Sequence, residues 1–460
     1  MRGGGFVLST LLALLGVALV TRHLGVADFG RFQTVISLIT VVGTVSDAGM
    51  GALGLREYAQ RHGEDRDRLM RALLGVRIAF TLIGALIAAG IAVAVGYDWD
   101  LVLGTLLAGL GLVFIVLQTT LTIPLATGLR NVTLTLVDLL RQLLTVGGYT
   151  LLVALGAGVV AFLGVTIPVG IVLVAVAALL ARGQVPLRPS VALGEWGKLL
   201  RAAAAFAMAT AVGTIYLYTA QILTAAVTDA RETGLFSASF RVFVVAAGIP
   251  ALLITVAFPL LSRAAQDDHE RLAYAVQRLF DTTSILGFGA ALGLVVGAPA
   301  IIDVMAGAGF ADAVPALRIQ GATLAATFIL APLGFVLLSL HAHREILIVN
   351  CVALVVMLAS VTVLASRMGP EGAALGTVIG ETTLAASYLI ALRLTAPDVV
   401  PGPGRAVRAL AAVAPCFAIL LVDGLPSWAA AVVALVAYSV LLVVLRAVPD
   451  ELLELMSRRR

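Results

Sequence analysis

The sequence predicts an all-α, polytopic membrane protein with about 14 transmembrane helices. Of its 460 residues, 61% are hydrophobic and only 12% are charged. Apolar stretches of about 20 residues, the length that crosses a bilayer, recur along nearly the whole chain. A soluble fold of this size could not bury so much apolar surface, so lipid must be its solvent.

The predicted helices are the apolar runs between charged or turn-rich breaks. The breaks include "TRHLG" after the first run, "REYAQRHGEDRDRLMR" after the second, "GYDWD" after the third and "RGQVPLRPSVALGEWGKL" after the sixth. The runs lie at 6–22, 33–55, 72–95, 101–126, 132–155, 159–181, 200–227, 235–261, 279–305, 316–340, 346–366, 372–394, 407–422 and 428–447. The first leads into "TRHLG" without a small-residue cleavage pattern, so we interpret it as a retained span.

The distribution of basic residues predicts the orientation. With a cytoplasmic N-terminus, 22 of the 30 Lys and Arg residues fall in inward connections, five in outward ones and three within spans. Because Lys and Arg concentrate on the cytoplasmic side of membrane proteins, both termini are predicted to be cytoplasmic. No outward connection exceeds roughly a dozen residues. We therefore expect no external catalytic domain and no enzyme activity.

The two halves of the chain show a weak internal repeat. "GRFQTVISL" resembles "GLFSASFRV", "YAQRHGEDRDRLMRAL" resembles "AAQDDHERLAYAV", and "AFLGV" resembles "AALGT". Six helices separate the copies, which predicts two bundles of six helices with the same orientation. The expected domains are an N-terminal bundle over 1–197, a C-terminal bundle over 198–395, and two additional helices with a cytoplasmic tail over 396–460. Such a duplication suits a transporter that works by alternating access.

Composition also excludes several partners and sites. The net charge of +4 and the lack of a basic block interleaved with aromatic residues argue against nucleic acid. The only two cysteines, Cys351 and Cys416, lie inside apolar runs and read as small core residues, not as a disulfide or metal pair. We expect no metal and no cofactor.

Three stretches resemble one known family. "TRHLGVADFGRFQ", "FSASFRV" with the later "FPLLSR", and "GPEGAALGTVIGE" are similar to the oligosaccharidyl-lipid flippases, the polysaccharide transporter family of the multidrug/oligosaccharidyl-lipid/polysaccharide exporter superfamily. The resemblance covers about the first 395 residues and implies a bacterial inner-membrane flippase for cell-surface polysaccharide biosynthesis. Its cargo would be an undecaprenyl-diphosphate-linked oligosaccharide. Membrane lipid and a polysaccharide polymerase would be its partners, and H⁺ or Na⁺ its coupling ion.

Arg241 is the first candidate for binding the diphosphate. It stands inside the eighth apolar run, where a permanent cation is costly unless a partner or function compensates it. A guanidinium suits a diphosphate because its planar fork makes bidentate, charge-assisted hydrogen bonds. The resemblance implies a cavity role for Arg241 and a second contact for Arg22. Snorkelling to the interface is the alternative for both.

Other intramembrane polar residues complete the candidate set. Tyr216, Tyr218 and Gln221 suit either sugar contacts or interface anchoring. Asp47 and Glu381 lack a cation nearby in the sequence, so either could couple transport to H⁺ or Na⁺, or be held by a donor of another helix. Asp138 and Arg141, three residues apart, are expected to neutralise each other.

Two alternative functions stay open, a lipid II flippase and a multidrug exporter. The resemblance implies an arginine pair late in the second helix of lipid II flippases, but "TVVGTVSDAGM" has Gly43 and Thr44 there. That departure argues against lipid II. A cation-coupled multidrug exporter is the other alternative, although the three arginines within spans, Arg77, Arg141 and Arg241, disfavour a cavity for organic cations.

Overall fold

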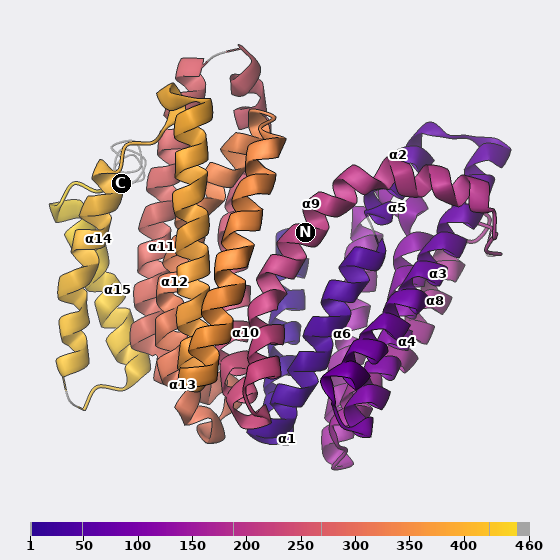
Figure 1. Ribbon diagram of the computed structural model, residues 1–460, viewed down its shortest axis with the longest axis horizontal. Helices are drawn as coiled ribbons and strands as arrows, with labels where there is room; N and C mark the ends of the chain where they lie inside the picture. The colour runs from indigo at the N-terminus through magenta and orange to yellow at the C-terminus, as the bar shows by residue number, and fades with distance from the viewer. Residues whose placement is uncertain (1, 48, 187, 268, 423, 449–460) are drawn as a thin grey trace. The chain divides into compact units, whose positions relative to one another are not determined.

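The computed structural model describes residues 2–47, 49–186, 188–267, 269–422 and 424–448 (Figure 1). Every regular element in these residues is a helix, as the hydropathy pattern predicts. The chain forms two compact units, one of residues 1–226 and one of residues 227–460. The division falls within the last turn of one helix, later than the 197/198 boundary expected from the repeat. The repeat itself stays a prediction.

The first unit contains nine helices in the described residues. They are α1 (Arg2–Asp47), α2 (Met50–Gln60), α3 (Gly63–Val95), α4 (Trp99–Leu121), α5 (Ile123–Thr127), α6 (Asn131–Ala154), α7 (Val159–Gly164), α8 (Thr166–Leu180) and α9 (Leu193–Val227). Three short breaks were not predicted. Asp47 ends α1 before α2, Leu121 ends α4 before α5, and Gly164 ends α7 before α8.

The described part of the second unit contains six α-helices and three short 3₁₀ helices. The α-helices are α10 (Ala230–Asp267), α11 (His269–Ala306), α12 (Val314–Ser339), α13 (His343–Thr395), α14 (Gly404–Cys416) and α15 (Ser427–Val444). The 3₁₀ helices are η1 (Ala308–Ala313), η2 (Pro397–Val399) and η3 (Phe417–Leu421).

Eleven helical segments of the described residues are long and apolar enough to cross a membrane. Two of these segments, Leu11–Gln60 and His343–Thr395, each contain two of the predicted spans. The shorter apolar helix Val212–Val227 is the last part of α9 and matches the predicted seventh span. The fourteen predicted spans therefore all have a helical counterpart, and the chain is a multi-pass membrane protein.

Glycines in the left-handed region divide the two longest helices. Gly25 has φ 71° within α1, and Gly369 has φ 58° within α13. A side chain at such φ values is strained, so glycine is the residue that turns the chain there. In α13 the two arms lie side by side (Figure 1), and Ser360 donates a hydrogen bond to the carbonyl of Gly376 at 3.2 Å. Each of these helices is thus two predicted spans joined without a loop.

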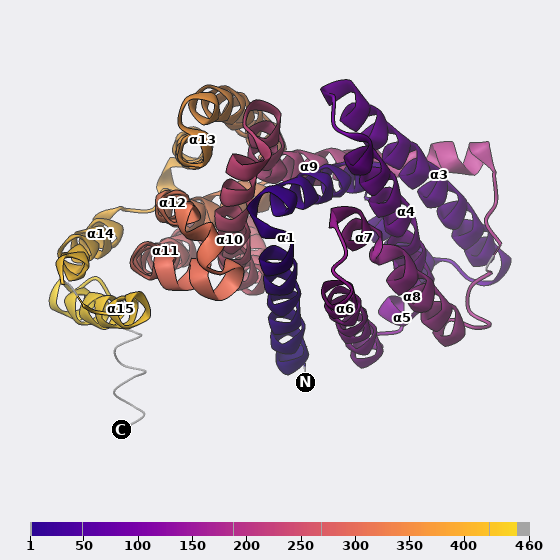
Figure 2. The same ribbon diagram turned by 90° about the horizontal axis from the view of Figure 1, so that it is seen from below.

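The beginning of α9 packs on the first unit. Trp196 donates its indole N–H to the carbonyl of Ser190 at 3.1 Å, and the Ser190 amide bonds to the carbonyl of Arg71 at 2.9 Å. Leu199 and Ala203 of α9 join a buried cluster with Met70 of α3. These contacts explain why α9 belongs with the first unit (Figure 2), although the hydropathy pattern assigns its apolar end to the second bundle.

The two C-terminal helices pack within the second unit. Arg405 of α14 forms an ion pair with Asp281 of α11 at 3.2 Å, and the Asp281 side chain is fully buried. Tyr438 of α15 donates a hydrogen bond to the carbonyl of Ile285 at 2.9 Å. The extension over 396–460, expected from the sequence to stand outside the repeat, is therefore held on α11 by its described residues.

Candidate functional site

Arg241 lies in the first half of α10 on a strongly buried stretch. At about 1.5 Å per residue, it stands about 16 Å along the axis from Ala230, deeper in its helix than the predicted start of the span suggests. Its neighbours Phe240, Val242 and Phe243 are buried, and Arg241 itself is half-buried. Its Nε is buried and has no hydrogen-bond partner among the described residues.

The surroundings of Arg241 leave its charge uncompensated in the described part of the chain. No ion pair joins it to a described carboxylate, whereas Arg231, on the same helix, pairs with Asp312 at 2.9 Å. A half-buried cation without a protein counter-ion is unfavourable in an apolar environment. An anionic ligand would supply the missing charge.

Arg22 and the three polar residues of α9 belong to the first unit. Arg22 is exposed and lies just before the turn of α1 at Gly25. Tyr216 and Gln221 are buried, and Tyr218 is half-buried. All four take part in contacts within the protein. Their roles toward a substrate stay predictions.

Asp47 is held by a cation that the sequence did not connect with it. Asp47 ends α1, and Arg77 of α3 donates from Nε and Nη2 to its Oδ1, the first at 2.9 Å. The amide of Gly51, at the start of α2, contacts the other carboxylate oxygen at 3.4 Å. The carboxylate of Asp47 therefore links the end of α1 to both α3 and the start of α2.

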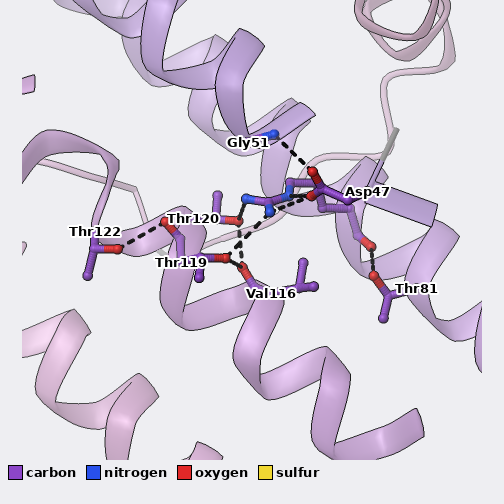
Figure 3. Close-up of polar contacts among 8 residues, drawn as sticks. Asp47, Gly51, Thr81, Val116, Thr119, Thr120 and Thr122 are labelled. Carbon is purple, nitrogen blue, oxygen red and sulfur yellow. Dashed lines mark hydrogen bonds and ion pairs between the residues drawn. The ribbon is translucent and has the colours of Figure 1, made fainter. Parts of the chain in front are cut away.

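Two threonines of α4 complete this cluster. Arg77 donates from Nη1 to Thr120 at 2.6 Å and from Nη2 to Thr119 at 3.4 Å. Figure 3 shows Asp47 on one side of the cluster and the two threonines on the other. The Arg77 side chain is 6% exposed and the Asp47 side chain 29%. No local period relates these residues, because 30 positions separate Asp47 from Arg77, so the sequence carried no signal for the pair.

Glu381 lies in the second arm of α13, where it is 8% exposed. Thr327 of α12 donates a hydrogen bond to its carboxylate at 3.0 Å. One turn earlier on both helices, the hydroxyls of Thr323 and Thr377 lie 3.3 Å apart. Glu381 therefore sits in a line of polar contacts between two membrane helices.

Asp138 and Arg141 pair as the sequence predicts. Arg141 donates from Nη2 to Asp138 at 2.9 Å. Among the described residues, no group of three or more His, Cys, Asp and Glu side chains could hold a metal ion. The polar residues of the two units thus offer permanent cations, the buried carboxylates of Asp281 and Glu381, and neutral hydrogen-bonding groups.

This fold and these residues define a multi-pass, all-helical membrane protein. A family of polysaccharide biosynthesis proteins matches residues 19–315, and the chain belongs to this family. No curated protein matches the chain in sequence.

Solved structures with the same fold are transporters and flippases. The lipid II flippase MurJ, in an inward closed conformation, is 13% identical with a TM-score of 0.77, and the match covers 97% of each chain. An inward-facing multidrug resistance MATE family transporter of the MOP superfamily is 14% identical with a TM-score of 0.70 over 85% of this chain and 95% of that one. A MOP superfamily transporter from Pyrococcus furiosus is 16% identical with a TM-score of 0.56 over 86% of this chain and 93% of that one. At these identities the matches establish the fold alone.

Proposed function

We propose that the protein moves an undecaprenyl-diphosphate-linked oligosaccharide from the cytoplasmic to the outer leaflet of a bacterial inner membrane. Membership of the polysaccharide biosynthesis family and the transporter fold support this substrate class. A headgroup of sugars and diphosphate cannot cross about 30 Å of hydrocarbon without a polar path. A protein that works by alternating access supplies such a path.

Arg241 is the observation that carries the proposal. Its half-buried guanidinium has no carboxylate partner among the described residues, so a lipid diphosphate would compensate its charge. Arg22 is the second candidate for the diphosphate, and Tyr216, Tyr218 and Gln221 are candidates for the sugars. An organic cation would be repelled by Arg241, which is why a lipid-linked anion is preferred over a drug.

Replacing Arg241 tests this role. In proteoliposomes that contain a fluorescent undecaprenyl-diphosphate-linked glycan, Arg241→Ala should slow translocation about ten- to hundred-fold, because each charge-assisted hydrogen bond contributes about 1.5–3 kcal/mol. Arg241→Lys should retain part of the activity, since it keeps the charge but loses the planar fork.

Arg231→Ala is the matched control, because Arg231 lies on the same helix but already has a carboxylate partner. Translocation should be unchanged in this variant. Normal translocation by both Arg241 variants, with normal folding, would refute the diphosphate role. Efflux of organic cations from the same vesicles, without lipid movement, would instead assign the protein to the multidrug exporters.

Glu381 is our candidate for coupling to H⁺ or Na⁺. Its burial and its bond from Thr327 place a carboxylate between α12 and α13. In the Glu381→Gln variant, the carboxylate can no longer bind a proton or cation, so translocation should lose its dependence on the gradient. Glu371→Gln on the same helix is the control and should keep it. A Glu381→Gln variant that still responds to pH and Na⁺ gradients like the wild type would exclude this residue.

A further inference from the structure

Helix α6 is unusual among the membrane helices of this protein. Of the eleven candidate spans in the described residues, Asn131–Ala154 has the lowest mean hydropathy and the smallest buried share. A polar helix inside a membrane is normally covered by other helices. The polar side chains that α1 and α8 leave uncovered on α6 therefore need water or a polar ligand beside them.

The apolar residues of α6 occupy two of its faces. Val137, Leu140 and Leu144 pack against α8, in one cluster with Val169 and Leu173. Three exposed apolar side chains form a second face, which suits contact with lipid: Val132, Leu136 and Leu143.

The polar residues of α6 form a third face, which we call the α6 polar stripe. Its members recur at alternating intervals of four and three residues, so they lie on one side of the helix. They are Asn131, Thr135, Asp138, Gln142, Thr145 and Tyr149, with Arg141 at the edge. From residue 131 to residue 149 the stripe is about 27 Å long, which is close to the thickness of the hydrocarbon core.

The middle of the stripe is accessible in the described part of the protein, whereas Tyr149 at its end packs against Gly16 of α1 and has its ring 5.7 Å from that of Phe162. The Asp138 and Arg141 side chains are 56% and 37% exposed. Gln142 is half-buried, and no described residue makes a hydrogen bond to its amide. Facing hydrocarbon, an unpaired amide and an exposed ion pair would both be strongly unfavourable. The stripe therefore faces water or a polar ligand.

The chemistry of the stripe points to a neutral, hydroxyl-rich ligand. Its two charges neutralise each other through the bond of Arg141 to Asp138 at 2.9 Å. Its other members are amides, hydroxyls and a phenol, which both donate and accept hydrogen bonds. A diphosphate would require an uncompensated cation, and an organic cation would require an uncompensated acid. Carbohydrate hydroxyls can hydrogen-bond to the stripe without needing an uncompensated cation or an uncompensated acid.

We infer that the α6 polar stripe lines the path of the carbohydrate headgroup and hydrogen-bonds its hydroxyls during translocation. This inference rests on the proposed function. The stripe binds sugar, and the diphosphate role stays with Arg241.

The reaction rate of introduced cysteines tests whether water reaches the α6 polar stripe. In a background with Cys351→Ser and Cys416→Ser, single Thr135→Cys, Gln142→Cys and Thr145→Cys variants are treated with the charged thiol reagent sulfonatoethyl methanethiosulfonate. Because a thiol needs water to ionise, these variants should react at least about ten-fold faster than Leu136→Cys and Leu143→Cys on the lipid-facing side of the same helix. Stripe variants as unreactive as the leucine controls would overturn the inference.

Protection by two lipids tests which ligand the stripe binds. The probes are undecaprenyl diphosphate and undecaprenyl-diphosphate-linked N-acetylglucosamine. The sugar-bearing lipid should slow modification of the Gln142→Cys variant several-fold, and undecaprenyl diphosphate should not. Equal protection by the two lipids, or protection by neither, would contradict a sugar contact.

The Arg241→Ala variant separates this test from that of the proposed function. The affinity for undecaprenyl diphosphate should fall in Arg241→Ala and stay unchanged in Gln142→Leu. The sugar increment, which is the difference in affinity between the sugar-bearing lipid and undecaprenyl diphosphate, should fall only in Gln142→Leu. If Arg241→Ala leaves the binding of both lipids intact, the diphosphate role fails while the sugar result stands by itself. If Gln142→Leu keeps the full sugar increment, the stripe proposal fails while the diphosphate role stands.

Discussion

Arg77→Ala should lower the free energy of unfolding of the first unit by about 3–5 kcal/mol, the range found when one partner of a buried ion pair is removed. Arg77 donates to Asp47, Thr119 and Thr120, and its own side chain is almost fully buried. Its removal leaves the carboxylate of Asp47 without its cation at the break between α1 and α2. A lower melting temperature of the detergent-purified protein would show the effect.

A double variant distinguishes loss of a charge partner from loss of packing. Arg77→Met combined with Asp47→Leu removes both charges and fills the space with apolar side chains, so its stability should return close to that of the wild type. If the double variant is as unstable as Arg77→Ala, the ion pair is not the cause. If Arg77→Ala melts like the wild type, the cluster in Figure 3 does not stabilise the unit.

Gly376→Val should prevent correct packing of the two arms of α13 and cost more than about 3 kcal/mol. A Cβ at Gly376 would stand 2.7 Å from the Cα of Val361 and 2.8 Å from its backbone nitrogen, too close for any side chain without movement of the backbone. The next glycine toward the turn, Gly372, is closer still, since a Cβ there would lie 2.0 Å from the carbonyl oxygen of Leu364. The two arms of α13 can therefore pack this closely only because these positions have no side chain.

Yield and size-exclusion behaviour of the purified protein measure this effect. Gly90→Ala in the exposed part of α3 is the control, because nothing lies within 4 Å of a Cβ at that position. Alanine there should leave stability unchanged or raise it by up to about 1 kcal/mol, since glycine is the poorer helix former. A Gly376→Val protein that elutes and melts like the wild type would show that the arms can separate without cost.

The spans could be predicted from the sequence because their cause is local. A run of apolar residues such as 72–95 must form a helix in lipid to satisfy its backbone, and the structure has α3 over Gly63–Val95. The tight turns could not be predicted in the same way. Gly25 and Gly369 are two of 46 glycines, and only their φ values show that the chain reverses its path there without a loop.

The candidate site was predicted in part. Arg241 was identified because a cation within an apolar run is conspicuous in the sequence, and the structure adds that no described carboxylate neutralises it. The pairing of Asp138 with Arg141 followed from helical spacing. The partner of Asp47 could not be found, because Arg77 belongs to another helix.

By itself, the sequence determined that this protein is a multi-pass, all-helical membrane protein, because hydrophobic length is a property of contiguous segments. Only the tertiary structure decided that Asp47 is neutralised by Arg77, that Glu381 receives a bond from Thr327, and that the polar side of α6 is left accessible. These contacts, and the exposure of α6, depend on which faces of separate helices pack together. The packing of segments far apart in the sequence is not encoded in any local periodicity.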